Sequence, residues 1–447
     1  MVTRDASMLL GGMIFYPGGE HLTSWRLPGG REDGYLDVEH YDHVAQTAER
    51  GGFATLFIAD ELYVWDRFAS GIDHVVNVRP EPFTLLGALT RSTQRIGLAA
   101  TISTTYNEPY HSARQLASLD HLSHGRAGWN LVTSASDEEA WNFGLDENLD
   151  HAARYRRAAE YVEVVQGLWD SWDDDAFRHD PVSGVFADRS KLHVLDHRGE
   201  FFRVRGPLNS ARPPQGHPVL FQAGASEDGR ALAGACAEAV FTLSGGGLTG
   251  AQALYADYKR RAVDNGRNPD HLKVLPAVSP VLGETHARAL ERLEEIEELT
   301  PDRLSLDWLS HYLGVDVSGH PLDDRFDFDF ANAARGANQV QSVFDSIRRL
   351  MDSATFTLRD LYRTLLRRRF LPGTPESVAQ FLAERFTGGA ADGFMLAFSS
   401  LPVGVDEFVD QVVPQLRRLG VYHGEYVGET LRENMGLPVP ASRYATG

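Results

Sequence analysis

Short apolar runs alternate with amphipathic helical patterns along almost the whole chain, and this alternation restricts the fold more than any other feature. Nearly every apolar run precedes a segment with apolar residues at i, i+3 and i+4, the spacing of a helix that buries one face. Strands that alternate with helices indicate a parallel sheet with crossover helices. We expect eight strands, over residues 9–16, 53–59, 95–103, 127–132, 218–223, 239–243, 272–281 and 393–398. Helical patterns cover residues 41–50, 82–93, 113–122, 152–169, 251–262, 375–386 and 406–419.

A parallel sheet with crossover helices closes into a barrel when it has eight strands. Such a (β/α)8 barrel takes roughly 250 residues, whereas this chain has 447. Two long segments account for much of the difference: one is rich in Asp, Gly and Pro, and the other has helical patterns separated by polar turns. The sequence therefore predicts an α/β fold, a TIM barrel forming a single domain over 1–447, with insertions at about 172–214 and 284–372.

Charge and composition exclude several classes of function. The chain has 43 Lys and Arg against 62 Asp and Glu, a formal net charge of −19, which disfavours binding to a nucleic acid backbone or an anionic membrane surface. No apolar stretch reaches about 18 residues, and the N-terminal apolar run is too short for a signal peptide. The single cysteine, Cys236, excludes a disulfide framework, and no metal-ligand pattern accompanies it. We therefore expect a cytoplasmic enzyme without a metal, nucleic acid or membrane partner.

Candidate site residues follow from the barrel prediction, because the reacting groups of such barrels lie at the carboxyl ends of the strands. Small or polar residues end several of the predicted strands or follow them closely. They suit a surface that hydrogen-bonds a flat ligand, although capping of the adjoining helices explains each of them equally well. These candidates are His21, Asp60, Thr101, Ser103, Asn130 and residues 224–226.

Two helix starts are candidates for binding an anion. Ser226 opens a helix whose free N–H groups favour a phosphate, but Glu227 and Asp228 in its first turn would repel one unless they point away. An ordinary N-cap is therefore the simpler interpretation of Ser226 alone. His151 and Tyr155 lie at i and i+4 at another helix start, and both can donate to a phosphate. Taken alone, such a pair is more often a packing contact.

Two further motifs point to no separate site. Residues 245–250 (GGGLTG) match the dinucleotide-binding pattern G-x-G-x-x-G, but the next strand does not end in an acidic residue and the motif follows the sixth strand. We interpret this segment as a flexible loop over the pocket. The arginine-rich segment at 367–370 (RRRF) is typical of a solvated helix end.

Four stretches of the sequence have a more specific pattern. They are 104–134 (TTYNEPYHSARQLASLDHLSHGRAGWNLVTS), 142–172 (NFGLDENLDHAARYRRAAEYVEVVQGLWDSW), 197–209 (HRGEFFRVRGPLN) and 214–230 (PQGHPVLFQAGASEDGR). Together they resemble the flavin-dependent monooxygenases of the bacterial luciferase superfamily. Within it, the chain is most similar to the branch of the nitrilotriacetate, EDTA and dibenzothiophene-sulfone monooxygenases and pristinamycin synthase.

The resemblance implies a TIM barrel that binds reduced FMN from solution and reacts it with O2. A flavin peroxide would then transfer one oxygen atom to a small organic substrate. The resemblance also implies a separate NAD(P)H:FMN reductase as a partner, which fits the poor dinucleotide signal, and a homodimer or homotetramer.

The resemblance assigns roles at the flavin ring. Asp60, together with Thr101 or Ser103, would contact the ring, and Asn130 would lie near its reactive edge. His21 stands where related enzymes carry a histidine near the oxygenated face of the flavin. It is a candidate proton donor or hydrogen-bond partner, and His21 and Asn130 are the candidate catalytic residues.

The resemblance also joins the two anion candidates into one phosphate site. His151 and Tyr155 would bind the phosphate or the ribityl chain, and Ser226 with the backbone of Ala225 would complete the site.

The substrate does not follow from the resemblance. The opening loop, residues 61–79 and residues 243–250 depart from the family pattern, and they border the substrate side of the predicted barrel. Organosulfur compounds, alkanes and aminopolycarboxylates remain open, with a slight preference for a hydrophobic or organosulfur substrate. A flavin- or F420-type hydride-transfer enzyme on the same barrel is the alternative, and a non-catalytic flavin-binding protein is a third possibility.

Overall fold

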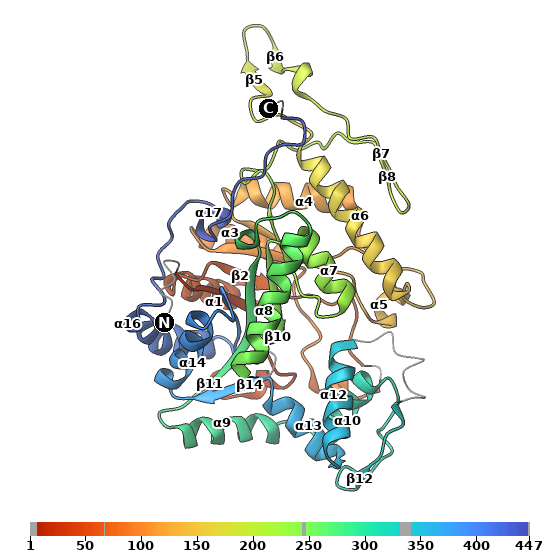
Figure 1. Cartoon of the computed structure of the whole chain (residues 1–447), viewed down its shortest axis with the longest axis vertical. Helices are drawn as coiled ribbons and strands as arrows, with labels where there is room; N and C mark the ends of the chain where they lie inside the picture. Colours follow the sequence, from red (N-terminus) through yellow and green to blue (C-terminus); the bar gives the residue numbers. More distant parts are fainter. Residues whose placement is uncertain (1–6, 67, 244–246, 331–340, 446–447) are drawn as a thin grey trace.

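The computed structural model describes residues 7–66, 68–243, 247–330 and 341–445, and its centre is a closed barrel of eight parallel strands (Figure 1). Each strand pairs in parallel with the next, and β1 pairs with the last strand at Leu9 and Gly393 to close the barrel. The predicted α/β TIM barrel is therefore confirmed, and each predicted strand ends within two residues of the observed one. The barrel strands are β1 (Leu9–Ile14), β2 (Thr55–Ile58), β3 (Gly97–Ser103), β4 (Ala127–Val132), β9 (Val219–Gln222), β10 (Ala239–Leu243), β11 (Lys273–Leu282) and β15 (Gly393–Ala397).

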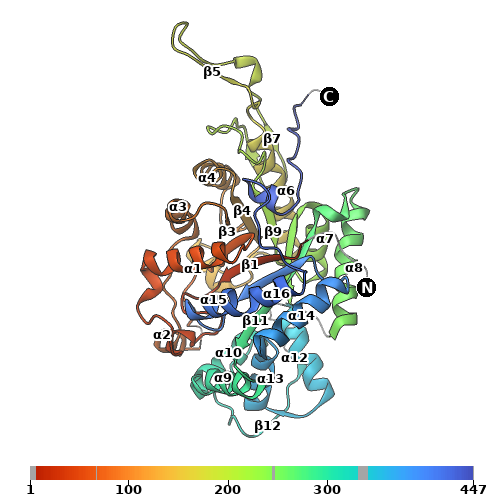
Figure 2. The ribbon, with the colours of Figure 1, turned by 90° about the vertical axis from the view of Figure 1, so that its left-hand side faces the viewer.

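Helices surround the barrel, and their ends follow from local sequence (Figure 2). Thr374 caps α14 by accepting a hydrogen bond from the Ser377 N–H, with Pro375 at the first helical position, as the sequence predicts. The outer helices are α1 (Val38–Arg50), α3 (Pro82–Ser92), α4 (Pro109–Leu122), α6 (His151–Trp169), α7 (Glu227–Cys236), α8 (Gly247–Asp264), α14 (Pro375–Thr387), and the continuous run of α15 (Val403–Glu407), a π-helical turn (Phe408–Val412) and α16 (Val413–Arg418). Two short helices, α2 (Gly71–His74) and α5 (Asp137–Asn142), lie after β2 and β4.

Side chains of each strand alternate between the surrounding helices and the barrel interior. On β3, Leu98 and Ala100 belong to the core shared with the outer helices, whereas Ala99 belongs to the interior cluster. The interior is filled mainly by apolar groups, and the rings of Phe57 and Phe241 meet edge to face at 5.3 Å. The barrel is thus a packed core, and only its carboxyl-end mouth is left to hold a ligand.

The opposite end of the barrel is sealed by α17 (Leu431–Asn434). Thr430 and Glu433 form a capping box at its start, and Leu431 packs into the interior cluster. Arg432 is 1% exposed and forms a bidentate ion pair with Glu238, at 2.6 and 2.8 Å. Its Nε also donates to the backbone oxygen of His217. The last helix therefore belongs to the barrel core.

The two segments predicted as insertions carry structure of their own. Residues 172–214 contain the hairpins β5 (Phe177–Asp180)–β6 (Val185–Ala187) and β7 (His197–Arg198)–β8 (Arg203–Val204), which project from the barrel (Figure 1). Residues 284–372 contain α9 (His286–Glu298), α10 (Asp302–Leu313), α12 (Gln341–Ser353), α13 (Leu358–Arg367) and the short pair β12 (Arg325–Phe326)–β13 (Phe356–Thr357). They end at β14 (Phe370–Gly373), which pairs with the end of β11. The second segment packs through its own apolar cluster against residues that follow β1 and β2.

Among the helices that the structure describes, none is both long and apolar enough to cross a membrane.

Candidate functional site

Polar side chains replace apolar ones on the barrel interior where β3 and β4 approach the mouth. Both Thr101 and Asn130 are buried, and the Asn130 Nδ2 donates to the Thr101 hydroxyl at 3.0 Å. Thr101 in turn donates to the backbone oxygen of Ile58 on β2, at 2.6 Å. These bonds fix the amide, and in the described part of the chain Asn130 Oδ1 has no hydrogen-bond partner although it is buried. It is a preformed acceptor for a ligand N–H.

A second polar group lies beyond the end of β3. The hydroxyls of Ser103 and Ser134 are 2.8 Å apart, and Ser134 donates to the Glu139 carboxyl at 3.0 Å. The Leu62 N–H reaches the same carboxyl oxygen at 3.3 Å. Burial raises the pKa of Glu139 to about 7. This carboxyl can therefore hold or release a proton close to neutral pH, one hydroxyl away from Ser103.

Asp60 lies just after β2, and one arginine, Arg79, faces both Asp60 and the adjacent Glu61. The Arg79 guanidinium lies 3.9 Å from the Asp60 carboxylate and 3.6 Å from that of Glu61. It also donates to the backbone oxygen of Phe15 at 3.1 Å, so that it ties the end of β1 to the segment after β2. Burial raises the pKa of Asp60 to about 6 in spite of Arg79. The positive charge of Arg79 at this edge of the mouth is therefore already compensated by the two carboxyl groups.

The two predicted anion candidates meet at the neighbouring starts of α6 and α7. His151 is the first residue of α6, and its ring lies 4.9 Å from that of Tyr155. The Ser226 hydroxyl caps α7 by accepting from the Gly229 N–H at 3.1 Å, and it lies 3.4 Å from the Tyr155 hydroxyl. The sequence interpretation of Ser226 as an N-cap is confirmed. The fold also places an imidazole and two hydroxyls at the start of one helix.

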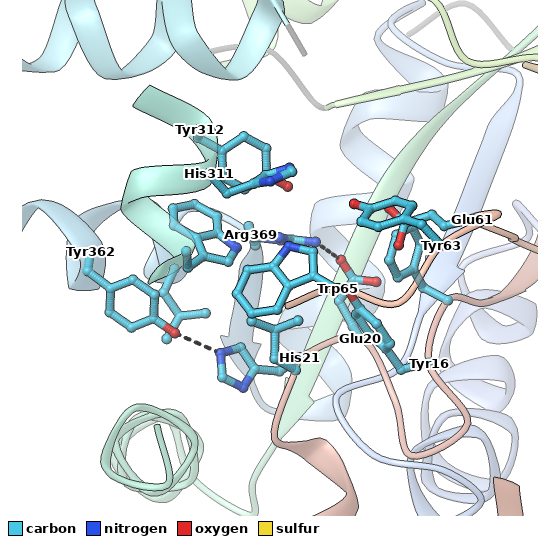
Figure 3. A pocket seen from close by; sticks show the side chains of 14 residues that line it. Tyr16, Glu20, His21, Glu61, Tyr63, Trp65, His311, Tyr312, Tyr362 and Arg369 are labelled. Atoms are coloured by element: carbon cyan, nitrogen blue, oxygen red, sulfur yellow. Dashed lines mark hydrogen bonds and ion pairs between the residues drawn. The ribbon is translucent and has the colours of Figure 1, made fainter. Parts of the chain in front are cut away.

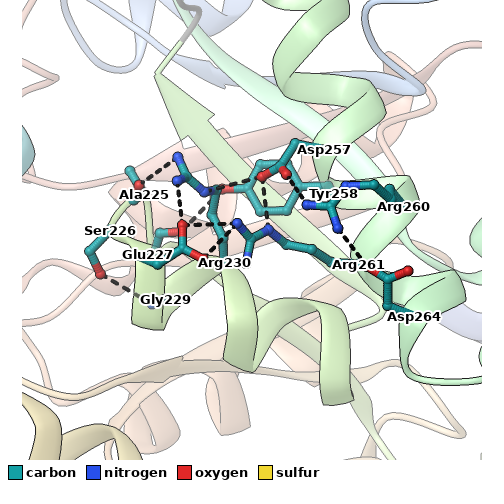
Figure 4. A network of polar contacts seen from close by, with 11 residues as sticks. Ala225, Ser226, Glu227, Gly229, Arg230, Asp257, Tyr258, Arg260, Arg261 and Asp264 are labelled. Carbon is teal, nitrogen blue, oxygen red and sulfur yellow. Dashed lines mark hydrogen bonds and ion pairs between the residues drawn. The ribbon is translucent and has the colours of Figure 1, made fainter.

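The first-turn acids of α7 are both engaged. The Glu227 carboxylate points to Arg230 and Arg261 and pairs with each at 2.8 Å, and these arginines lower its pKa (Figure 4). It therefore points away from Ser226, so that the condition stated for an anion site is met for Glu227 but not for Asp228. Asp228 instead pairs with His151 Nδ1 at 3.0 Å. The imidazole is thus held in place by a carboxylate on the partner helix.

A cavity lies between the ends of β1 and β2 and the helices α10 and α13 (Figure 3). It is small, with an enclosed volume of about 40 Å³. Most of the side chains around it are aromatic or aliphatic. The lining residues are Phe15, Tyr16, Glu20, His21, Leu22, Glu61, Tyr63, Trp65, Trp308, His311, Tyr312, Tyr362, Leu366 and Arg369.

His21 lies in this cavity with both ring nitrogens engaged. Its Nδ1 is 2.9 Å from the Thr23 hydroxyl, and its Nε2 is 3.0 Å from the Tyr362 hydroxyl. Burial and the nearby Arg369 charge lower the pKa of His21 to about 3. The imidazole is therefore neutral in the working range of an enzyme, and any proton that it donates comes from a neutral N–H.

The interpretation of residues 367–369 as a solvated helix end is wrong for Arg369. This side chain pairs with Glu20 and lines the cavity, because the chain turns inward between α13 and β14. Arg367 fits the interpretation better, since its side chain is half exposed and pairs with Glu297. The glycine-rich motif at 245–250 lies partly outside the described residues. The strand before it, β10, is the sixth barrel strand, as expected.

Sequence reasoning missed the cavity aromatics of the second insertion, and it noted Trp65 only as part of the segment 61–79 that borders the substrate side. Trp65 comes from an irregular segment after β2, which carries no periodic pattern. Trp308 and Tyr312 lie at i and i+4 on α10, and Tyr362 lies on α13. An aromatic stripe on a helix of the second insertion is the signal that could have found them, but the sequence does not show which helix faces the mouth.

The chain is a TIM barrel with polar groups at its strand ends. An imidazole and two hydroxyls lie together at one helix start. These are features of a barrel enzyme that binds a phosphate-bearing ligand at its mouth. The sequence profile of the luciferase-like monooxygenase family matches residues 20–392, and the chain belongs to this family. It is an oxidoreductase of the flavin-dependent monooxygenase class.

Characterised relatives match over nearly the full length. The chain is 43% identical to the N-acetyl-S-(2-succino)cysteine monooxygenase of Bacillus subtilis (strain 168), covering 100% of both chains. It is 42% identical to the dibenzothiophene-sulfone monooxygenase of Rhodococcus erythropolis (strain XP), over 98% of each chain. It is 40% identical to nitrilotriacetate monooxygenase component A of Aminobacter aminovorans, over 97% of each.

Solved structures agree with this assignment. The EDTA monooxygenase of Chelativorans sp. BNC1 superposes with a TM-score of 0.81 at 33% identity, covering 97% of this chain and 98% of that one. A riboflavin lyase whose structure holds a modified FMN superposes with a TM-score of 0.83 at 31% identity, covering 97% of this chain and 96% of that one.

Proposed function

We propose that this chain is the oxygenase component of a two-component system that uses reduced FMN and O2 to oxygenate a small organic substrate. The observation that carries the proposal is the meeting of His151, Tyr155 and Ser226 at the start of α7. These groups converge on one point from two helices, as the binding of a phosphate on a strongly anionic protein requires.

The residues at the mouth fit the other part of an FMN molecule. The isoalloxazine ring carries an N–H on its pyrimidine edge, and the partnerless Asn130 Oδ1 is an acceptor for such a group. Thr101 holds that amide in place. Ser103 and Asp60 stand at the ends of the neighbouring strands and add polar groups around the ring. We assign all four residues to the flavin ring, and His151, Tyr155, Ser226 and the Ala225 backbone to the ribityl phosphate.

Reduced FMN, when bound, supplies the electrons that activate O2 for transfer of one oxygen atom to the substrate. The protein's own task is to orient the ring, exclude water and manage protons. The aromatic cavity beside His21 keeps the reacting region dry. His21 offers a neutral N–H, while Glu139, with its pKa of about 7, can exchange a proton near the ring.

A separate reductase is the expected partner. The relative from Aminobacter aminovorans is named as component A, which implies a further component of that enzyme. We propose that an NAD(P)H:FMN reductase supplies reduced FMN by diffusion. We further propose a cytoplasmic protein of one domain that assembles as a homodimer or homotetramer, which sedimentation of the purified chain would measure.

The test is a reconstitution with a separate NAD(P)H:FMN reductase under 18O2. We expect one 18O atom in the product from a panel of thioethers, sulfones, alkanes and an aminopolycarboxylate. Product should appear only when reductase, FMN and O2 are all present. The F420- or flavin-type hydride-transfer alternative predicts anaerobic hydride exchange with substrate instead. Anaerobic exchange without 18O incorporation would overturn the proposal, and no product from the whole panel would favour a non-catalytic flavin-binding protein.

A further inference from the structure

Each hydroxyl at the ends of β3 and β4 carries one hydrogen, and neighbouring acceptors already hold these hydrogens. The inference rests on the proposed function, in which Thr101, Ser103 and Asn130 face the flavin ring. By strand alternation, Thr101 and Ser103 point to the same side of β3 as Ala99, which belongs to the barrel interior. A hydroxyl whose hydrogen is already used can only accept a hydrogen bond from a ligand.

The hydrogen of Thr101 is held by the backbone of β2. The Thr101 hydroxyl donates to the Ile58 oxygen at 2.6 Å, so that towards Asn130 it can only accept. The side-chain amide of Asn130 must therefore turn its Nδ2 to Thr101, at 3.0 Å, and its Oδ1 away. Among the residues that the structure describes, this buried Oδ1 has no hydrogen-bond partner. It is one acceptor offered to a ligand.

The hydrogen of Ser103 is held by a row of groups that ends at Glu139. The Ser134 hydroxyl lies 3.0 Å from Glu139 Oε1 and 2.8 Å from the Ser103 hydroxyl. A carboxylate is the stronger acceptor of the two, so the hydrogen of Ser134 goes to Glu139. The 2.8 Å contact is then made by the hydrogen of Ser103, which donates to Ser134. One lone pair of Ser103 faces the Tyr106 N–H at 3.4 Å, and the other is a second acceptor for a ligand.

The surrounding backbone holds this row in place. The Leu62 N–H also donates to Glu139 Oε1, at 3.3 Å, so this oxygen stays an acceptor even when the other carboxyl oxygen carries a proton. Ser134 has φ +51°, in the left-handed region that residues other than glycine rarely adopt. Its backbone oxygen accepts hydrogen bonds from Arg154 and from Asn148 Nδ2, the latter at 3.3 Å. The direction of the hydrogen bonds is therefore built into the fold.

We propose that Glu139 and Ser134 are positioning residues that keep Ser103 a hydrogen-bond acceptor, and that they thereby make the mouth select reduced over oxidised flavin. The reduced isoalloxazine ring carries an additional N–H at N5, where the oxidised ring has a nitrogen that only accepts. An acceptor such as Ser103 binds the first form, whereas against the second it leaves two acceptors opposed and unsatisfied. The N–H that both forms carry is the one assigned to Asn130.

The test is the binding of oxidised and reduced FMN to the full-length protein, by equilibrium dialysis in air and anaerobically with dithionite. The quantity compared is the dissociation constant of oxidised FMN divided by that of reduced FMN. Ser134→Ala and Glu139→Leu each release the hydrogen of Ser103, which can then donate to the oxidised ring. We expect the ratio to fall about 10-fold in both variants, mainly because oxidised FMN binds more tightly. General damage to the site does not produce such a gain.

Two controls separate the hydrogen-bond row from the charge of Glu139. Glu139→Gln keeps an amide oxygen where the Leu62 N–H and Ser134 need an acceptor, so the ratio should stay within about twofold of the wild type. Glu147→Leu removes an exposed carboxylate that follows α5 and should leave the ratio unchanged.

Circular dichroism checks that each variant is folded, and if one of Ser134→Ala and Glu139→Leu does not fold, the other decides. An unchanged ratio in either folded variant, or equal losses for both forms of FMN, overturns the inference. A ratio in Glu139→Gln as low as in Glu139→Leu also overturns it, because the charge and not an acceptor would then carry the effect.

Failure of this inference differs from failure of the proposed function. Incorporation of 18O together with an unchanged ratio in the two variants would refute the role of Glu139 and Ser134 but keep the oxygenase. The expected ratios without any 18O incorporation would refute the oxygenase but keep the positioning role.

Discussion

Replacement of His151 by alanine should weaken the binding of FMN but not of riboflavin. The imidazole lies at the shared start of α6 and α7, beside Tyr155 and Ser226. Riboflavin has the same ring and ribityl chain but no phosphate. A side chain that binds only the phosphate therefore affects one ligand and spares the other.

The size of the effect follows from the exposure of the group. A hydrogen bond to a charged partner contributes about 1.5–3 kcal/mol. The His151 side chain is 41% exposed, so that water screens it and the lower end of that range applies. We therefore expect about a 10-fold weaker FMN affinity, which corresponds to about 1.4 kcal/mol. Tyr155→Phe, which removes one neutral hydroxyl, should cost about half as much in free energy.

The assay is anaerobic equilibrium dialysis of reduced FMN and reduced riboflavin against each variant. His43→Ala is the matched control, because His43 is a half-exposed histidine that also pairs with a carboxylate, Asp406 at 2.9 Å, but lies on α1. Equal losses for FMN and riboflavin in His151→Ala would show that the residue supports the fold and not the phosphate. An unchanged FMN affinity would refute the phosphate site altogether.

Three further predictions concern stability and pH, each measured by chemical unfolding. Arg432→Met leaves the Glu238 carboxylate without its bidentate partner and should lower the free energy of unfolding by about 3–5 kcal/mol. A second change, Glu238→Gln, should restore part of this loss. A double variant no more stable than Arg432→Met would contradict the reasoning. The pKa of Glu139 is raised to about 7, so its ionisation opposes folding as the pH rises from about 4.5 through 7, by up to about 3 kcal/mol. Glu139→Gln should remove this loss between pH 5 and 8, and a pH dependence equal to that of the wild type would count against it. Gly52→Ala should cost at least about 2 kcal/mol, because Gly52 has φ +80° and a Cβ there would lie 2.2 Å from the Gly424 backbone oxygen; a stability within about 0.5 kcal/mol of the wild type would refute the clash.

The barrel could be predicted from the sequence because each strand–helix unit carries its own signal. The runs at 127–132 and 239–243 match β4 and β10 residue for residue, since apolar residues buried on both faces and the adjoining turns fix their ends. The strand at 9–16 is two residues shorter, because the chain bends at Phe15 and Tyr16 to form the cavity wall. The apolar pattern of the sequence thus predicts the ends of a strand where burial of that strand alone determines them.

For the candidate site, the sequence predicted the position of a side chain only where that position depends on its place in the barrel series. Thr101 and Asn130 lie two residues before the ends of β3 and β4, so the barrel rule finds them. The pairing of Asp228 with His151 and of Glu227 with two arginines depends on how α7 packs on α6 and α8, which no local pattern specifies. The inward turn of Arg369 has the same origin. Which polar side chains reach the barrel mouth thus depends on how the helices pack, and the sequence alone shows only which residues are candidates.

The position of α17 has a consequence for how the chain is made. The first strand pairs with the last, at Leu9 and Gly393, and the floor of the barrel is added only with residues 430–437. During synthesis the inner faces of β1 to β4 therefore lack their final cover until residues 430–437 have been made. Pairing across so long a sequence separation is slow and leaves apolar strands exposed to other chains. A nascent chain that still lacks residues 430–437 therefore exposes apolar strand faces that are prone to aggregation.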